Sequence, residues 1–328
     1  MSFFYQKAVT QINQAIEKTK YGNQPTELYE PIRYIMSLGG KRLRPMLTLI
    51  SYYMFNEKGD YAPALKPAIA VELFHNFTLM HDDIMDNAPL RRGKATVHEK
   101  WNTNVAILSG DVMLVEAYKM IMHIPDENIR HLLDRFSQTA KEVCEGQQWD
   151  MNFEKQDNVS LEAYMKMIEF KTAVLLGFSL ELGATLGGAS EKDAEHLYEF
   201  GRHVGLAFQV MDDYLDAFGD AEKFGKQVGG DIISNKKTFL TINSLELAKG
   251  KDKENLTKLF SSPTTDPTQK VKTVLVLYEK LKIKELTQQQ IESQYQTALQ
   301  HLSAIKSIGP FKRNLLKGFT DSLMERES

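Results

Sequence analysis

Apolar residues recur at spacings of three and four along most of this chain, which is the pattern of helices that bury one face. The clearest stripe lies between residues 68 and 85 and consists of Val71, Phe74, Phe77, Met80 and Ile84. The same period predicts further helices at residues 43–55, 105–124, 129–150, 161–186, 191–216, 237–249 and within 268–302. No segment alternates polar and apolar residues convincingly enough to predict a strand. We therefore expect an all-α protein.

The breaks between these helical stretches are short. Glycine, proline and asparagine punctuate the chain at residues 39–40, 87–89, 187–188, 219–230 and 261–267. None of these connections is long enough to be an obvious interdomain linker, and no repeat with a period of roughly 20–50 residues is evident. The simplest organisation is one large helical bundle, a single domain of residues 1–328.

Composition excludes several classes of protein. The net charge of −3 provides no basic excess for binding nucleic acid or an anionic membrane surface. The most apolar stretch, residues 173–188, contains Glu181 and four glycines and is too short for stable membrane insertion. The first 23 residues lack the unbroken apolar core of a signal peptide. The single cysteine, Cys144, rules out an internal disulfide, so we expect a cytoplasmic protein with Cys144 in its core.

Two segments share the pattern Asp-Asp-x-x-Asp within otherwise apolar helices: Asp82, Asp83 and Asp86, then Asp212, Asp213 and Asp216. The first and third carboxylates of each motif lie about 40° apart on one helix face, where their like charges repel. A hard cation relieves this repulsion, and Mg²⁺ typically takes one or two carboxylates together with substrate phosphates. Two such faces opposing each other would hold a metal cluster around a diphosphate. The alternative is a pair of solvated acidic helix ends.

Polar and basic residues accompany both motifs. His75 and Thr78 lie within about 40° of Asp82 on the same predicted helix face. The pair Gly39-Gly40 precedes three cations, and arginine can grip phosphate through two donors. The basic and polar candidates are Lys41, Arg42, Arg44, Arg91, Arg92, Lys171, Thr172, Gln209, Lys226, Lys236 and Lys237. Each one alone is more often a solvated surface group, but together they supply the positive charge that two diphosphates need.

In this order, the motifs resemble those of the trans-isoprenyl diphosphate synthases, the group of farnesyl and geranylgeranyl diphosphate synthases. The resemblance runs from Gly39 to Lys237 and includes Gly-Gly-Lys-x-x-Arg-Pro, both acidic motifs, Arg-Arg-Gly, Lys-Thr and Gln-x-x-Asp-Asp. It implies a polyprenyl synthetase domain with the all-α isoprenoid synthase fold around a deep central cavity, and a homodimer. It also implies three Mg²⁺ ions per active site, for which Mn²⁺ can substitute.

The resemblance further implies roles for individual residues. It makes Asp82, Asp86 and Asp212 direct metal ligands, with Asp216 at the same metal cluster and Asp83 and Asp213 in support. It counts Arg91 and Lys171 with these aspartates as catalytic. The isopentenyl diphosphate site would consist of Lys41, Arg44, His75 and Arg92. The allylic diphosphate would contact Arg91, Lys171, Thr172, Gln209, Lys226 and Lys236, although a longer loop at residues 228–231 leaves the choice between Lys236 and Lys237 open.

The implied reaction is the head-to-tail (1'-4) condensation of isopentenyl diphosphate with dimethylallyl, geranyl or farnesyl diphosphate. Its products would be pyrophosphate and a short all-trans prenyl diphosphate. Phe77 and Thr78 stand five and four residues before Asp82, where a bulky side chain resembles a floor for the growing tail. One aromatic residue beside a small threonine suggests a C15 or C20 product, with Phe74 as the next barrier.

Three other functions are compatible with these motifs. A terpene cyclase or head-to-head prenyl synthase would share the helical class, but cyclases generally carry a second metal motif of Asn/Asp, Ser/Thr and Glu. A non-catalytic subunit of a heteromeric synthase would be expected to have lost part of the acidic set, which is intact here. The third is an unrelated metal phosphohydrolase.

Overall fold

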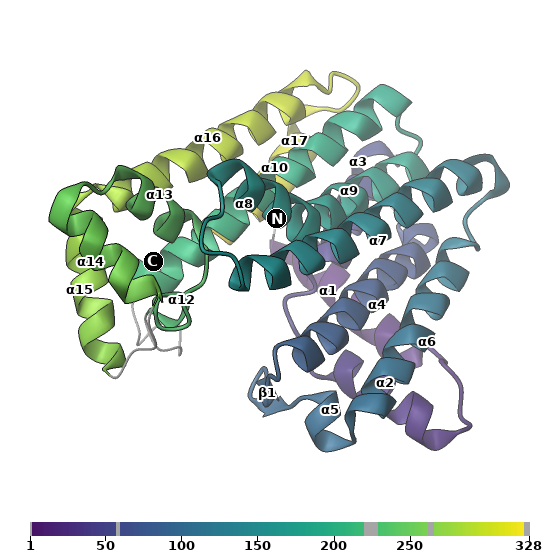
Figure 1. The fold of residues 1–328 in the computed structure, drawn as a ribbon. Helices are drawn as coiled ribbons and strands as arrows, with labels where there is room; N and C mark the ends of the chain where they lie inside the picture. Colours follow the sequence, from purple (N-terminus) through teal and green to yellow (C-terminus); the bar gives the residue numbers. More distant parts are fainter. Residues whose placement is uncertain (1, 57–59, 220–228, 262–265, 325–328) are drawn as a thin grey trace. The chain divides into compact units, whose positions relative to one another are not determined.

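The computed structural model describes residues 2–56, 60–219, 229–261 and 266–324, and Figure 1 draws their fold as a ribbon. Every regular element in these ranges is a helix, apart from one antiparallel hairpin of β1 (Leu90–Arg91) and β2 (Lys94–Ala95). The predicted all-α class is confirmed. The hairpin was not predicted, because two residues per strand are too few to produce a recognisable alternation.

The chain divides into two compact units. Unit 1 comprises residues 1–137, 178–197 and 306–316. Its own helices are α1 (Ser2–Lys18), α2 (Thr26–Ser37), α3 (Leu43–Phe55), α4 (Ala62–Met85), α5 (Val97–Lys100) and α6 (Thr103–Ile121). Helix α4 packs against α1, α2, α3 and α6, so it forms the centre of this unit.

The central position of α4 follows from its sequence. Residues 67–74 are all buried, which a helix achieves only when apolar side chains surround it. The helix ends at Met85, and Asn87 then adopts a left-handed conformation with φ of 49° that turns the chain toward the hairpin. The first acidic motif therefore lies at the C-terminal end of a buried helix, with two arginines of the hairpin just beyond it.

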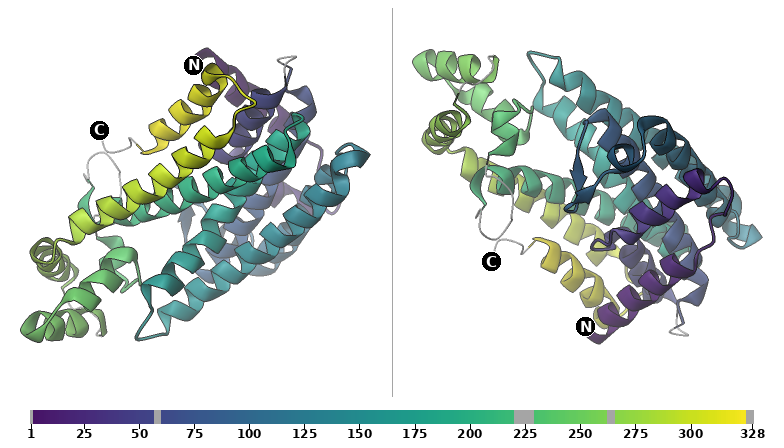
Figure 2. Two further views of the ribbon diagram at one scale, coloured as in Figure 1. Left: turned by 90° about the horizontal axis from the view of Figure 1, so that it is seen from above. Right: turned by 90° about the horizontal axis from the view of Figure 1, so that it is seen from below.

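Unit 2 comprises residues 138–177, 198–305 and 317–328. Its own elements are α8 (Leu161–Ile168), the π-helix η1 (Glu169–Ala173), α12 (Gly230–Ile233), α13 (Phe239–Leu247), α14 (Gly250–Ser261), α15 (Pro267–Lys280) and α16 (Ile283–Ala304). Both units contain parts of α7 (Asp126–Glu154), α9 (Val174–Leu186), α10 (Glu191–Phe218) and α17 (Pro310–Met324). Figures 1 and 2 both show α13, α14 and α15 gathered together, and α16 packs against α13 and α15.

Several predicted helices need correction. The stretch 161–186 contains a π-helical turn, η1, between α8 and α9, where a Cβ atom at Gly146 would lie 2.3 Å from the Lys171 nitrogen. The apolar pattern continues through this turn, so periodicity could not reveal it. The stretch 268–302 is two helices, separated at Lys282 by a left-handed residue with φ of 57°. Cys144 was predicted to be buried but is exposed, because α7 turns Val143 and Gln147 inward instead.

No helix in the described part of the chain carries an apolar run long enough to cross a bilayer. The assignment of residues 1–328 to one domain stays a prediction.

Candidate active site

The three aspartates of the first motif have different surroundings. Asp83 is only 2% exposed and accepts hydrogen bonds from Arg91, from Nε to both carboxylate oxygens at 2.8 and 2.9 Å and from Nη2 to Oδ1 at 2.7 Å. Asp82 is partly exposed and Asp86 is exposed. The middle carboxylate is therefore committed to a protein ion pair, whereas the first and third are accessible from one face of α4.

Both acidic motifs lie at helix C-termini. Asp82 and Asp83 belong to the last turn of α4 with Asp86 as its C-cap, and Asp212 to Asp216 occupy the last two turns of α10. The C-terminus of a helix carries partial negative charge, so carboxylates are disfavoured there. A bound cation would offset this repulsion at each end, and the ligands on offer are carboxylate oxygens, which suit Mg²⁺. The residues present therefore fit the predicted metal.

In the second motif, Asp213 and Asp216 bind other parts of unit 2. Asp213 is 8% exposed and accepts hydrogen bonds from the Tyr164 hydroxyl at 2.5 Å and the Phe239 amide at 3.2 Å. Burial raises the pKa of Asp213 to about 7. Oδ2 of Asp216 accepts a hydrogen bond from the Asp231 amide at 2.9 Å. Asp212 is exposed. The motif thus anchors α13 and α12 with two of its carboxylates.

Four arginines gather near His75 in unit 1. Burial lowers the pKa of His75 well below its ordinary value, and the charges of Arg44, Arg92, Arg91 and Arg42 lower it further. Arg44 differs from the other three, because its Nε–H is buried without a hydrogen-bond acceptor among the described residues. Burial lowers the pKa of Arg44 to about 10. A buried N–H group on a cation lowers the stability of the protein unless an acceptor, such as the oxygen of an anion, hydrogen-bonds to it.

Neighbouring side chains hold this arginine cluster in place. Arg42 is 5% exposed and donates to Glu72, itself 3% exposed, at 2.7 Å. Arg92 donates to the Gly39 carbonyl, and a Cβ atom at Gly40 would lie 2.8 Å from the Arg92 guanidinium. Gly40 also has a φ of 126°, a conformation that residues with a Cβ atom rarely adopt, which favours glycine at this position. The sequence reasoning missed Glu72, although a lone glutamate within an apolar helix is a signal for a buried ion pair.

Unit 2 contains a small polar cavity of about 120 Å³. Its polar lining includes Lys171, Thr172, Gln209, Asp213, Lys236 and Lys237. Lys171 lies on η1 and pairs with Asp150 at 2.5 Å, and Thr172 donates to Gln209 at 3.2 Å. Asp150 and Tyr164 were not foreseen, because nothing local in the sequence distinguishes them. π-helical turns often occur at functional sites, and this one carries Lys171 and Thr172 into the cavity.

The remaining predicted residues are spread between the units. Lys41 is exposed, and Thr78 donates to the His75 carbonyl at 2.8 Å. The Phe77 ring lies 5.6 Å from that of Phe74, which in turn lies 5.3 Å from Phe136. Both Lys236 and Lys237 line the unit 2 cavity, so neither is excluded. Lys226 lies outside the described residues. The catalytic, binding and chain-length roles of all these residues stay predictions.

Comparison with known proteins identifies what this chain is similar to. Residues 25–278 match the family model described as polyprenyl synthetase. A geranylgeranyl diphosphate synthase from Sulfolobus acidocaldarius is 33% identical, over 99% of both chains. One from Methanosarcina mazei is 41% identical, over 72% of both chains. A crystal structure of a geranylgeranyl pyrophosphate synthase superposes with a TM-score of 0.92 at 45% identity, covering 99% of both chains.

We predict opposite effects for two neighbouring arginines. Arg44→Met removes a buried donor that lacks a partner, so the free energy of unfolding should stay equal or rise, while affinity for inorganic pyrophosphate falls at least about tenfold. Arg42→Met, the matched control, strands the buried Glu72 carboxylate and should lower the free energy of unfolding by about 3–5 kcal/mol. Urea denaturation and titration calorimetry measure both quantities. Unchanged pyrophosphate affinity in Arg44→Met would remove Arg44 from the anion site.

Proposed function

The chain belongs to the polyprenyl synthetase family, and on that premise we propose that it condenses isopentenyl diphosphate with an allylic diphosphate, releasing pyrophosphate. The observation that carries the proposal is the arginine cluster around His75, where Arg44 keeps a buried donor without an acceptor. A diphosphate group provides the acceptor oxygens and the negative charge that this cluster requires. The relatives named as geranylgeranyl diphosphate synthases support a short-chain product, C15 to C20.

The chemistry requires charge stabilisation rather than a nucleophilic side chain. The allylic carbon–oxygen bond breaks, and its electron pair leaves with the diphosphate. The isopentenyl double bond attacks the allylic carbon, and a proton then leaves to the released pyrophosphate. Arg44, Arg92 and neutral His75 bind and orient isopentenyl diphosphate, while Lys171 and its cavity neighbours hold the allylic diphosphate. Exclusion of water by the surrounding helices protects the cationic carbon from capture.

We assign the divalent metal that the family needs to the accessible carboxylates. Asp82 and Asp86 would hold it at the end of α4, and Asp212 at the end of α10, with Asp216 close by. When bound, Mg²⁺ draws negative charge onto the departing diphosphate. Three ions per site, and Mn²⁺ as a substitute, are part of the proposal. The cytoplasmic location expected from the single cysteine stays a prediction.

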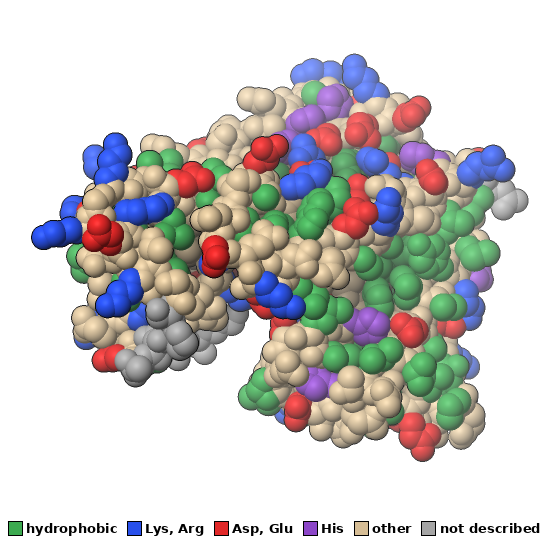
Figure 3. Space-filling model, in the orientation of Figure 1, with side chains coloured by type: hydrophobic (Ala, Val, Ile, Leu, Met, Phe, Trp, Pro, Cys, Tyr) green, Lys and Arg blue, Asp and Glu red, His purple; other side chains and the backbone are tan. Residues whose placement is uncertain are grey.

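We also propose that the chain forms a homodimer through α6. Leu108, Val115 and Met122 are 57%, 58% and 61% exposed and recur every seven residues, which aligns them on one helix face. Figure 3 shows hydrophobic side chains gathered over the part of the surface where Figure 1 places α6. A stripe of this kind can pack against the same stripe of a second copy, because an isologous interface needs only one self-complementary face.

The aspartate assignment predicts a loss of condensation in Asp82→Asn. Losing one carboxylate ligand should lower the rate at least about 100-fold at saturating magnesium, because charge on the leaving group is less well stabilised. The assay is incorporation of labelled isopentenyl diphosphate with each allylic primer. The control is Asp134→Asn, which removes an exposed carboxylate on α7 and should keep the wild-type rate. Full activity in Asp82→Asn would refute the metal role.

If the Phe77 ring blocks the growing prenyl tail, Phe77→Ala should make longer products. Removing the ring opens space five residues before Asp82, so the product distribution should shift by at least one isoprene unit. Chromatography of dephosphorylated products measures the shift. Leu79→Ala is the control, since Leu79 points about 160° away around α4 and should leave product length unchanged. The same distribution in Phe77→Ala and wild type would discard Phe77 as the floor.

The dimer assignment predicts dissociation by a charge on the α6 stripe. Leu108→Glu places carboxylates near each other across the two-fold axis, so sedimentation should change from dimer to monomer at micromolar concentration. Val276→Glu, at a 64% exposed position on α15, is the control and should remain dimeric. A wild-type monomer, or a Leu108→Glu dimer, would each contradict this interface.

A further inference from the structure

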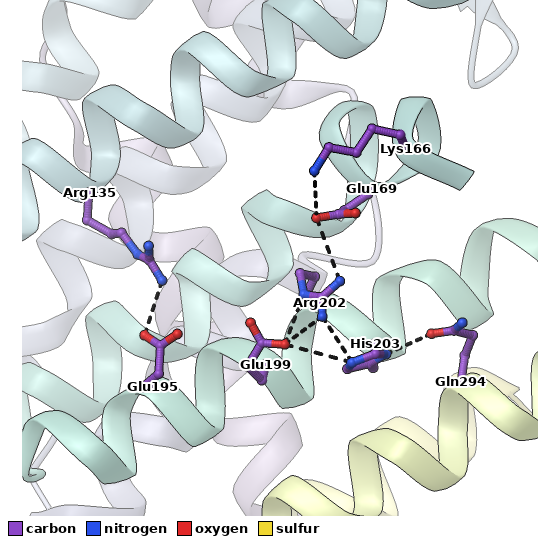
Figure 4. Close-up of polar contacts among 8 residues, drawn as sticks. All are labelled: Arg135, Lys166, Glu169, Glu195, Glu199, Arg202, His203 and Gln294. Atoms are coloured by element: carbon purple, nitrogen blue, oxygen red, sulfur yellow. Dashed lines mark hydrogen bonds and ion pairs between the residues drawn. The ribbon is translucent and has the colours of Figure 1, made fainter. Parts of the chain in front are cut away.

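A group of polar side chains in unit 2 lies outside the catalytic residues described above. Glu199 and His203 are one turn apart on α10, and His301 comes from α16. One ligand atom from each of these three residues lies within 4.8 Å of the others, and all three side chains are partly buried. Figure 4 shows the contacts that surround Glu199 and His203, which link α10 to α16 and to η1.

The hydrogen bonds of His203 define which of its nitrogens is available. Its Nδ1 lies 2.7 Å from the Gln294 carboxamide oxygen, which can only accept, so Nδ1 carries the proton and donates. Its Nε2 lies 3.1 Å from Nη2 of Arg202, and a guanidinium can only donate, so Nε2 is the acceptor. Burial lowers the pKa of His203, which favours this neutral form. A metal-bound histidine has the same arrangement, with one nitrogen fixed by a protein acceptor and the other presenting its lone pair.

Positive charge already contacts two of these three groups, Glu199 and His203. Arg202 donates to Glu199 at 2.6 Å and to His203 at 3.1 Å, so its guanidinium stands where a cation would sit. Burial raises the pKa of Glu199, but the hydrogen bond and charge of Arg202 outweigh this, so the pKa is lowered and the carboxylate is ionised. Arg202 also lies 3.6 Å from Glu169, and this second carboxylate would keep it paired if it left Glu199.

Glu199 and His203 already lie close to the spacing of two zinc ligands. Oε2 of Glu199 and Nε2 of His203 are 3.7 Å apart. Two ligands of a tetrahedral zinc ion, each about 2.0–2.1 Å from the metal, are separated by roughly 3.3 Å. Two imidazoles and one carboxylate leave a fourth position for water, and nitrogen ligands favour zinc-class ions over magnesium.

We propose that Glu199, His203 and His301 form a binding site for a divalent transition-metal ion of the zinc class, with Arg202 as the resident counter-charge that the ion displaces toward Glu169. This site is separate from the carboxylate motifs, which offer only oxygen ligands. Gln294 acts on the ion through His203 and is a positioning residue.

Cobalt(II) chloride tests the site without reference to catalysis. Tetrahedral cobalt with nitrogen ligands absorbs visible light far more strongly than octahedral cobalt bound by oxygen. The full chain is titrated with excess Mg²⁺ present, so that the oxygen sites are filled. We expect an intense band that saturates at about one equivalent of cobalt and disappears on addition of Zn²⁺.

Variants identify the ligands. His301→Gln should abolish the band, and Gln294→Ala should weaken cobalt binding about tenfold or more. Arg202→Gln should tighten binding, because Glu199 loses its competing cation. The matched control is His131→Gln, which removes a histidine paired with Glu181 at 3.1 Å elsewhere and should leave the titration unchanged. Circular dichroism checks folding, and Glu199→Gln replaces His301→Gln if that variant does not fold.

Absence of an intense band in the wild type overturns the proposal. An unchanged band in His301→Gln, or in Glu199→Gln where that variant is used, overturns it equally. Weaker cobalt binding in Arg202→Gln would contradict the placement of the ion at the guanidinium position. Loss of the band in His131→Gln would show that the metal binds elsewhere.

Discussion

Unbalanced charge near buried helices is the constraint on which the rest of this structure depends. Carboxylates stand at the C-terminal ends of α4 and α10, where the helix dipole already disfavours them. Arginines crowd around His75, and Arg44 among them keeps a buried donor without an acceptor. Such arrangements cost stability unless an opposite charge is bound, and we propose a metal ion for the carboxylates and a phosphate anion for the arginines.

Some charged side chains of the predicted site pair with other protein groups, whereas others are exposed to solvent. Asp83 is paired with Arg91, and Asp213 binds Tyr164 and the Phe239 amide, so each motif uses its middle carboxylate to anchor the surrounding chain. Arg42 does the same through Glu72. These buried, fully bonded groups hold their neighbours in position, and a site that must meet a ligand with defined geometry depends on that support.

The proposed transition-metal site illustrates the same principle with different ligands. Oxygen donors at the acidic motifs suit a hard ion such as Mg²⁺, whereas two imidazoles and one carboxylate in unit 2 suit a zinc-class ion. Ligand type therefore distinguishes the two proposed kinds of site. Arg202 pairs with Glu199 at 2.6 Å and lies 3.6 Å from Glu169.

The sequence by itself determined the helical class, the acidic and basic motifs and the family, because apolar periodicity and motif spacing are local properties of the chain. Residue type alone did not distinguish Arg42 from Arg44, or Asp82 from Asp83, and only the family resemblance gave them different roles. Packing then showed that Arg42 pairs with Glu72 and that Asp83 pairs with Arg91. The sequence pattern also did not reveal the roles of Glu72 and Tyr164 or the π-helical turn at Lys171. The prediction that Cys144 is buried was wrong. Tertiary structure decided these points, since burial and ion pairing depend on residues that are distant in sequence and meet only when helices pack.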